Sequence, residues 1–517
     1  MILLRRISAH SRIGACSLFL LVLLGLGCTD RARGQFISLK TAPVATGDQF
    51  HVFPSDHRGM GALSIAVADS LGDPFVNPAK AARLQRTRAF STPVYYAVTG
   101  SDGAGRTLPV GALVHAGAWF GGVSVAMQEL EMADARRPVV ILDQSFRTSS
   151  IWPPPSPDPL LRDRSANNQY ATALVGTQLT ESLALGGRVF WAGLEAVDGV
   201  ELLYPRSQRI DQEGHQLGLR VGLLAEWGEG RSAEALLLHH RADMTHDVAY
   251  VESEWDPMAE QTITTRRVER NLDRTHTWGL HLGYVQPLDE EGWHAGGVLT
   301  INRKGHPKIP NYELMNIPRD PGTTWAYNVG VGLARTVQQT TFGLDVIVEP
   351  IRSDTWVEAE TPVSIPEDDV FIPAGEKTII NDFNFANSTL RAGVRRAISW
   401  TELQLGLQVH TIRYDLEQHD RIEQTTRNQQ ESWSEWTVSW GAGLLLDDLQ
   451  IRYLGRVTTG TGRPGVATTT AFRTAELAGG ASDIILAPRG PLTLQDANVF
   501  THQLSVTIPI GGQGRED

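Results

Sequence analysis

The chain has 517 residues and carries 46 Lys or Arg against 58 Asp or Glu, which gives a net charge of −12. This acidic balance argues against a nucleic-acid partner, because nucleic-acid binders need a basic surface. The only cysteines are Cys16 and Cys28. Disulfides, thiolate metal sites and cysteine catalysis are therefore not expected in the rest of the chain.

Residues 1–34 have the composition of a cleavable secretory signal peptide. Arginines begin it, residues 16–26 form a short apolar core, and small residues at 32–34 predict cleavage before Gln35. That core is too short for a transmembrane helix. A lipoprotein acylated at Cys28 is the alternative. Because residues 1–34 include five Arg and one Asp, the remaining chain has 41 basic and 57 acidic residues, a net charge of −16.

Residues 35–88 hold few strand signals and are too many for a simple tail. Gly59 and Gly61 allow tight turns or close backbone packing. Asn77 followed by Pro78 favours a turn. We therefore expect a plug or hatch of small residues, with a disordered periplasmic tail as the alternative.

Residues 89–517 are predicted to form an outer-membrane β-barrel. The clearest strand is 215–227, where Leu219 and Val221 face one side and Arg220 and Gly222 the other. Similar alternation predicts hairpins at 109–119 with 121–131, 168–179 with 181–193, 215–227 with 231–242, 275–288 with 292–303, 323–336 with 340–350, 388–398 with 401–414, and 434–446 with 449–459, and lone strands at 89–99 and 498–510.

The connections between these strands indicate how the barrel is oriented. Short turns join the strands of each hairpin, whereas long polar links are expected at 133–167, 247–274, 351–387, 415–432 and 460–497. Such asymmetry is typical of outer-membrane barrels, in which the short turns and both termini are periplasmic. The fold class is thus all-β, a transmembrane antiparallel barrel of 14–16 strands. Sixteen is favoured, and fourteen is the alternative because 109–131 alternates weakly.

The apolar face of these strands is expected to meet lipid, since no later apolar run could cross a membrane as a helix. Seven tryptophans lie near strand ends, where an aromatic belt would place them: Trp191, Trp227, Trp278, Trp293, Trp325, Trp400 and Trp436. A soluble sandwich or propeller also alternates, but its strands are shorter than those predicted here.

Polar residues on the opposite face are candidates for lining the lumen. They are Arg188, Arg220, His281, His294, Arg391, Arg395, His410 and Arg452. They are interpreted as a network of ion pairs and water that fills the lumen and supports the barrel, or as an electrostatic field that selects permeants. The cluster from His239 to Asp247 alternates between faces, so no metal site is predicted. No catalytic motif or cofactor fingerprint occurs, and an enzyme is not expected.

Residues 59–79 resemble the segment before the first strand in the long-chain fatty acid transporter (FadL-like) family of outer-membrane barrels, and in the related PorV-type proteins of secretion systems. The matching residues are Gly59, Gly61, Ala66, Ala68, Asp69, Asn77, Pro78 and Ala79. The resemblance implies a plugged lumen, in which Gly59, Gly61, Asp69, Asn77 and Pro78 are the plug or gating candidates. The family's barrels have fourteen strands, which departs from the sixteen favoured here.

Three functions follow as expectations. The first is a gated channel or transporter for small hydrophobic molecules across the outer membrane, as the resemblance implies. The alternative is a PorV-type surface scaffold that binds an envelope protein and transports nothing. The stiff segment from Trp152 to Pro159 is a candidate partner arm for that role. An open porin ranks third, because a plug would block free diffusion.

Overall fold

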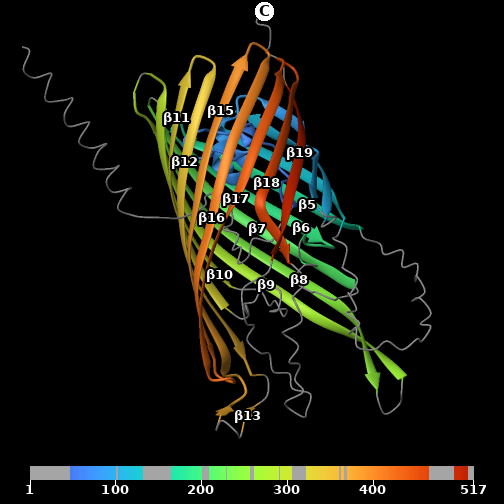
Figure 1. Ribbon diagram of the computed structural model, residues 1–517. Helices are drawn as coiled ribbons and strands as arrows, with labels where there is room; N and C mark the ends of the chain where they lie inside the picture. Colours follow the sequence, from blue (N-terminus) through green and yellow to red (C-terminus); the bar gives the residue numbers. More distant parts are fainter. Residues whose placement is uncertain are drawn as a thin grey trace, which may run out of the picture.

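The computed structural model describes residues 47–99, 103–131, 165–198, 200, 209–228, 230–256, 261–289, 291–305, 322–359, 362–365, 370–464 and 494–510. Their strands form one closed antiparallel barrel (Figure 1). Seventeen strand segments make up the sheet, but β1 (Thr87–Ser91) and β2 (Val94–Val98) share one position, which leaves sixteen. Both pair with β3 on one side and β19 on the other. The predicted strand count of sixteen is confirmed.

The remaining strands follow each other around the barrel in chain order, apart from one small hairpin. They are β3 (Ala104–Ala116), β4 (Trp119–Glu131), β5 (Ser165–Thr180), β6 (Leu183–Leu194), β7 (Arg209–Trp227), β8 (Arg231–Asp256), β9 (Gln261–Pro287), β10 (Trp293–Gly305), β11 (Gly322–Val337), β12 (Thr340–Glu358), β15 (Lys377–Ile398), β16 (Thr401–Asp420), β17 (Thr425–Leu445), β18 (Gln450–Pro464) and β19 (Leu494–Ile510). The hairpin of β13 (Val363–Ile365) and β14 (Val370–Ile372) lies between β12 and β15 in the chain.

Apolar side chains cover the outside of the barrel, as the alternation predicts. On β7, Leu219, Val221 and Leu223 are exposed, whereas Arg220 and Leu224 are buried on the inner face. An exposed apolar surface that encircles a closed barrel is the surface that lipid requires. This is therefore a transmembrane barrel.

Exposed tryptophans mark two levels on this outer surface. Trp227 ends β7 at a short turn, and Trp191 lies opposite Leu217, ten residues back along β7. Ten residues of strand span about 33 Å. At the usual tilt of about 40° this is a height of about 25 Å, the height of an outer-membrane apolar band. The two levels therefore fit the two membrane interfaces.

Several expected loops are in fact strand. The predicted link 247–274 is mostly the far halves of β8 and β9, which extend beyond the neighbouring strands in Figure 1. The links 351–387 and 415–432 likewise shorten to the stretches between β12 and β15 and between β16 and β17. These extensions lack a continuous apolar face, because charged side chains such as those of the Asp247–Arg270 ion pair, with Nη2–Oδ2 at 2.7 Å, stand among the exposed Val268 and Leu272. These predicted loops were wrong because alternation between an apolar and a polar face detects only the part of a strand whose outer face meets lipid.

Between residue 47, where the described part of the chain begins, and β1, the chain forms three short helical turns. They are η1 (Arg58–Met60), α2 (Asp73–Val76) and η2 (Pro78–Arg83). Within the described part of the chain, no helix has the length and apolar character needed to cross a membrane. The predicted signal peptide, the lipoprotein cysteine Cys28 and the proline-rich stretch from Trp152 to Pro159 lie outside the described residues.

Candidate functional site within the barrel

The candidate site is the N-terminal segment, residues 47–86, together with the inner wall that it contacts. Figure 1 shows it in blue within the ring of strands, toward the end that carries the short turns. Its hydrogen bonds, ion pairs and apolar contacts reach β1 to β8, β10 to β12 and β15 to β19. The segment therefore lies across the lumen rather than against one side of it.

Glycines on the inner wall make room for this segment close to the short turns. A methyl group at Gly186 would lie 2.6 Å from the carbonyl carbon of Pro78, and one at Gly296 would lie 2.9 Å from the backbone oxygen of Ile65. At Gly406 it would meet the backbone of Gly61. Real side chains do not approach backbone this closely. The wall glycines are thus required for docking, and their recurrence beside the short turns was a sequence signal that could have located the segment.

Gly59 and Gly61, both predicted plug residues, pack against β15, β16 and β17. Ser439 Oγ accepts a hydrogen bond from the Gly61 N–H at 3.0 Å and donates one to the Gly59 carbonyl at 3.1 Å. Gly61 has φ of 73°, a left-handed conformation that glycine adopts without strain. The predicted tight turn and close packing are both present, although the role of Ser439 was missed.

Asp69, another predicted residue, holds the turn between residues 55 and 72 together. Its Oδ1 accepts hydrogen bonds from the backbone N–H groups of Asp56, Leu71 and Gly72 at 2.9, 3.1 and 2.7 Å. Its Oδ2 accepts a further bond from Ser55 Oγ at 2.5 Å. A carboxylate that accepts several backbone bonds organises a loop strongly.

Asn77 and Pro78 begin η2 and join it to β7 and β8. The Asn77 side-chain oxygen accepts from the Ala79 N–H at 3.1 Å, a helix cap, while its Nδ2 donates to Glu234 Oε2 at 2.8 Å. Pro78 occupies the first helical position, where its missing N–H costs nothing. The predicted turn is thus a capped helix start pinned to the wall.

Lys80 and Asp73 complete a buried charge cluster around Glu234. Lys80 Nζ lies 2.9 Å from Glu234 Oε1 and 3.5 Å from Asp73 Oδ2. Burial lowers the pKa of Lys80, but the carboxylates of Asp73 and Glu234 outweigh it and raise the pKa above its ordinary value. Burial raises the pKa of Asp73, and neighbouring Asp69 and Glu234 raise it further. Lys80 therefore stays charged and neutralises a site that would otherwise hold an uncompensated carboxylate.

Two of the predicted lumen arginines hold the end of α2. Arg188 donates to the Phe75 carbonyl, and its guanidinium lies 4.7 Å from the centre of the Phe53 ring. Arg220 Nη1 donates to the Val76 carbonyl at 2.9 Å. Since the last carbonyls of a helix carry partial negative charge, cations are favourable there. These arginines fasten the segment to β6 and β7 rather than line an open pore.

The other three predicted arginines also meet the segment. Arg391 Nη1 donates to the Ala62 carbonyl and to Ser64 Oγ, both at 3.2 Å. Arg452 Nη1 forms an ion pair with Asp56 Oδ1 at 3.1 Å. Arg395 Nη1 lies 3.5 Å from His57 Nδ1 and 3.9 Å from Glu402 Oε2, and it is less buried than the others.

The predicted lumen histidines do not come together. His281 is buried, with Nδ1 2.7 Å from Thr300 Oγ1 and Nε2 3.9 Å from Glu234 Oε1. His294 lies beside a short turn, and His410 pairs with Glu435 at 3.2 Å. Because Thr300 is opposite His281, His294 lies six residues along β10 from that level, roughly 20 Å. Among the described residues no group of three His, Cys, Asp or Glu is arranged to hold a metal ion.

Residues 47–53 form a second anchor, which the sequence did not reveal. Gln49 Nε2 donates to the Ala196 carbonyl at 2.9 Å, and Gln128 Nε2 donates to the Gln49 carbonyl at 2.8 Å. Asp48 pairs with Arg456 and accepts from Thr501 Oγ1 at 2.6 Å. Burial raises the pKa of Asp48, but Arg456 and His51 outweigh it and hold the pKa well below its usual range.

A cavity of about 140 Å³ lies between the N-terminal segment and the wall. Aromatic and aliphatic side chains of the segment line it, including Phe50, Phe53, Phe75, Leu63 and Ile65. Many polar and charged side chains, including Arg58, Lys80 and Glu234, line it as well. The segment thus combines polar bonds to the wall with an apolar surface inside the lumen.

Comparisons with known proteins show a likeness in overall shape. The toluene transporter TodX of Pseudomonas putida is similar with a TM-score of 0.37 and 12% identity, over 87% of this chain and 96% of that one. A FadL homologue of Pseudomonas aeruginosa gives 0.41 and 11%, over 90% and 100%. The ferric-catecholate import receptor Fiu of E. coli gives 0.34 and 8%, over 82% of each. No protein-family model and no curated protein matches the sequence. At these levels the likeness carries no argument about substrate.

Proposed function

We propose that this chain is an outer-membrane transporter whose lumen is closed by the N-terminal segment and opened by its movement. The observation that supports this most directly is the spread of the segment's contacts over almost all strands of the barrel. A segment held on all sides obstructs the lumen, so a solute passes only when the segment shifts. An open porin is disfavoured for the same reason.

The proposed location follows from the outer surface. Only helices and closed barrels satisfy all backbone groups in lipid, and membrane barrels of this architecture belong to outer membranes. The two tryptophan levels on β6 and β7 match the thickness of such a membrane. The short-turn end would then be periplasmic, and the N-terminal segment would lie near the periplasmic mouth.

The proposed substrates are small hydrophobic molecules. The cavity of about 140 Å³ beside the segment supports this class through the apolar part of its lining, which includes Phe50, Phe53 and Phe75. Apolar side chains around a cavity of roughly 150 Å³ are enough to bind benzene. Phe53 stacks on Phe75 with ring centres 4.6 Å apart, and both side chains line this cavity. A ligand that packs there competes with the contacts that hold α2, so its binding favours release of the segment.

Uptake into vesicles whose outer leaflet is lipopolysaccharide tests the proposal, because small hydrocarbons cross a phospholipid bilayer without any protein. Full-length protein and a variant lacking residues 35–80 are compared with a small uncharged aromatic hydrocarbon and with a hydrophilic dye. The full chain is expected to pass the hydrocarbon and retain the dye, whereas the deletion passes both. Heat-modifiable electrophoretic mobility confirms that each barrel is folded. Identical permeation by both proteins would refute a gating role.

A surface scaffold is the second candidate, supported by the extensions of β8 and β9. Their outward faces carry the Asp247–Arg270 and Arg241–Asp243 pairs, with Nη2–Oδ2 at 2.7 Å and Nε–Oδ2 at 2.5 Å, beyond the apolar band. A polar hairpin that stands out of the membrane is a surface for an envelope partner. A partner that co-purifies in mild detergent with the full chain, but not after residues 246–271 are replaced by a short turn that joins Thr245 to Leu272, would support this role. Failure to recover any would count against it.

A further inference from the structure

An open hollow of about 600 Å³ lies on the outer surface of the barrel, over β18, β19 and β2 to β5. Its walls include Leu108 and Met127, whose side chains are 54% and 71% exposed and point away from the lumen. Pro93, one of its lining residues, lies between β1 and β2, and the strand register places it between Leu108 and Leu504. The hollow therefore faces the membrane rather than the lumen.

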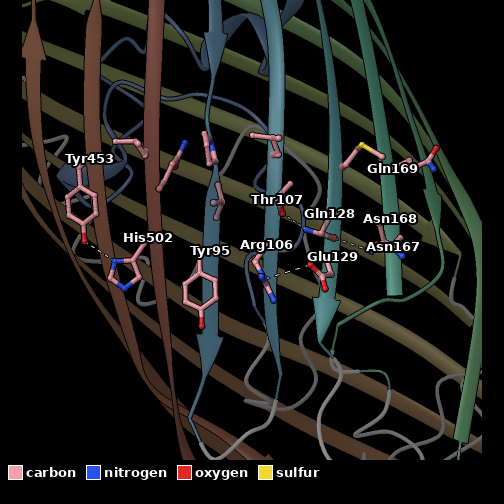
Figure 2. A pocket seen from close by; sticks show the side chains of 16 residues that line it. Tyr95, Arg106, Thr107, Gln128, Glu129, Asn167, Asn168, Gln169, Tyr453 and His502 are labelled. Carbon is pink, nitrogen blue, oxygen red and sulfur yellow. Dashed lines mark hydrogen bonds and ion pairs between the residues drawn. The ribbon is translucent and has the colours of Figure 1, made fainter. Parts of the chain in front are cut away.

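A row of polar and aromatic side chains crosses this hollow on adjacent strands. His502 is opposite Tyr95, Tyr95 is opposite Arg106, Arg106 is opposite Glu129, and Glu129 is opposite Asn167. Figure 2 shows these side chains at one level, with Tyr453 beside His502. Such a row interrupts a surface that is otherwise apolar toward the short turns.

The row lies at the membrane interface farther from the short turns. Glu129 is ten residues from Trp119, which begins β4 at a short turn. Ten residues also separate the two tryptophan levels on β7. Toward the short turns the next outward positions on β19, β3 and β4 are apolar, with Leu504, Leu108 and Met127 followed by Val110 and Val125, whereas Gln169 on β5 is opposite Met127. The hollow thus has a polar level at the lipid headgroups and an apolar level at the acyl chains.

The polar level offers both donors and acceptors with little net charge. Arg106 is balanced by Glu129, and their Nε–Oε2 distance of 3.8 Å makes a loose pair between two exposed side chains. The amides of Asn167 and Gln169 add donors and acceptors of both kinds. Tyr453 OH lies 2.8 Å from His502 Nδ1, and the Tyr95 ring stacks on His502 with centres 6.5 Å apart. These rings present flat, partly apolar faces beside polar groups.

We propose that this hollow binds a glycolipid of the outer leaflet through an uncharged sugar headgroup. Hydroxyl groups of a sugar both donate and accept, which fits the mixed set of Arg106, Glu129 and Asn167. A headgroup with net negative charge fits less well, because Glu129 offsets the one arginine. The acyl chains would lie over Leu108, Met127 and Leu504. This site is outside the lumen, so it holds whether or not the barrel transports.

Lipid retention in native mass spectrometry tests the site. The full chain is placed in nanodiscs that contain equal amounts of diglucosyl diacylglycerol, phosphatidylethanolamine and phosphatidylglycerol, and is then released in mild detergent. The wild type is expected to retain the glycolipid preferentially. Tyr95→Ala and Asn167→Leu are each expected to reduce its retention at least fivefold.

The matched control is Tyr327→Ala, since Tyr327 is an outward aromatic on β11 with a similar exposure of 38%. It is expected to leave glycolipid retention unchanged. All three variants change lipid-facing side chains, and heat-modifiable mobility verifies that each is folded. Equal loss in the control, unchanged retention in Tyr95→Ala and Asn167→Leu, or preferential retention of phosphatidylglycerol would each overturn the proposal.

Discussion

Replacing Gly61 with alanine is expected to loosen the N-terminal segment without unfolding the barrel. A methyl group there would lie 2.9 Å from the carbonyl oxygens of both Ala392 and Leu407, which are wall backbone and cannot rotate away. The left-handed conformation at φ of 73° adds strain of about 1–2 kcal/mol for any residue with a Cβ. A shift that relieves the clash weakens the two bonds to Ser439, worth about 1 kcal/mol each.

The strain and the two weakened bonds together cost about 3–4 kcal/mol. The ratio of docked to released segment therefore falls by a factor of roughly 10² to 10³. Hydrogen exchange of the backbone amides at 58–64 measures this ratio directly, since the protected amides exchange when the segment leaves the wall. The protection of β16 and β17 is expected to change little.

Gly218→Ala provides the matched control. Gly218 also faces the lumen, but its added methyl would lie 3.5 Å from Phe190 Cβ, an ordinary contact. Its exchange at 58–64 should equal that of the wild type. If Gly61→Ala were as protected as Gly218→Ala, the close packing of Gly61 would not be what holds the segment.

Three further predictions address the charge cluster, pH and the membrane surface. Lys80→Met should destabilise η2 by about 3 kcal/mol, because it leaves the Glu234 carboxylate buried without its cationic partner. Adding Glu234→Gln should recover much of that loss in a double-mutant cycle measured by hydrogen exchange. Burial raises the pKa of Asp198 to about 6, and Asp198 accepts a bond from the Gly47 N–H. Because this folded pKa is above the ordinary value near 3.9, the stability that protonated Asp198 contributes is lost as pH rises through 6. Protection factors at 47–53 should therefore be higher at pH 5 than at pH 7, and Asp198→Asn should remove the difference. Higher protection at pH 7 would contradict a raised pKa at Asp198. Val221→Arg, in the middle of the apolar band, should lower the free energy of unfolding of the barrel by about 2–4 kcal/mol in urea titrations. Glu213→Arg, near the outer interface, should change that free energy by less than about 1 kcal/mol. Equal effects of the two substitutions would show that the band is not in lipid.

The strands could be predicted where one face meets lipid. Leu219 and Val221 alternate with Arg220 and Gly222 because lipid and a packed lumen impose opposite requirements on the two faces of β7. Even β3 and β4, where small residues weaken the pattern, pair as predicted. The extensions of β8 and β9 could not be found in this way, since charged side chains such as Asp247 and Arg270 interrupt the apolar positions of the outward face there.

The candidate site was predictable only in part. Gly59, Gly61, Asp69, Asn77 and Pro78 stood out because glycine, proline and Asx residues have defined backbone roles. The wall residues that bind the segment did not stand out. Ser439, which bonds to Gly59 and Gly61, and Gln404, whose Nε2 donates to the Asp56 carbonyl at 2.6 Å, are ordinary polar residues whose importance depends on the docked backbone. Among the predicted lumen arginines, Arg188, Arg220 and Arg391 bind carbonyls of the segment, which periodicity cannot reveal.

The most direct test of a gated lumen is to lock the segment reversibly to the wall. The chain after residue 34 has no cysteine, so Ser64→Cys with Asp345→Cys introduces one pair, at a site where the Ser64 N–H donates to Asp345 Oδ2 at 2.9 Å. Thr324→Cys with Ser353→Cys, whose hydroxyls lie 2.9 Å apart on β11 and β12, bridges the wall alone. Oxidation should lower hydrocarbon uptake at least tenfold in the first variant, with recovery on reduction, and should not affect the second. Uptake at the wild-type rate through the oxidised Ser64–Asp345 variant would contradict the account.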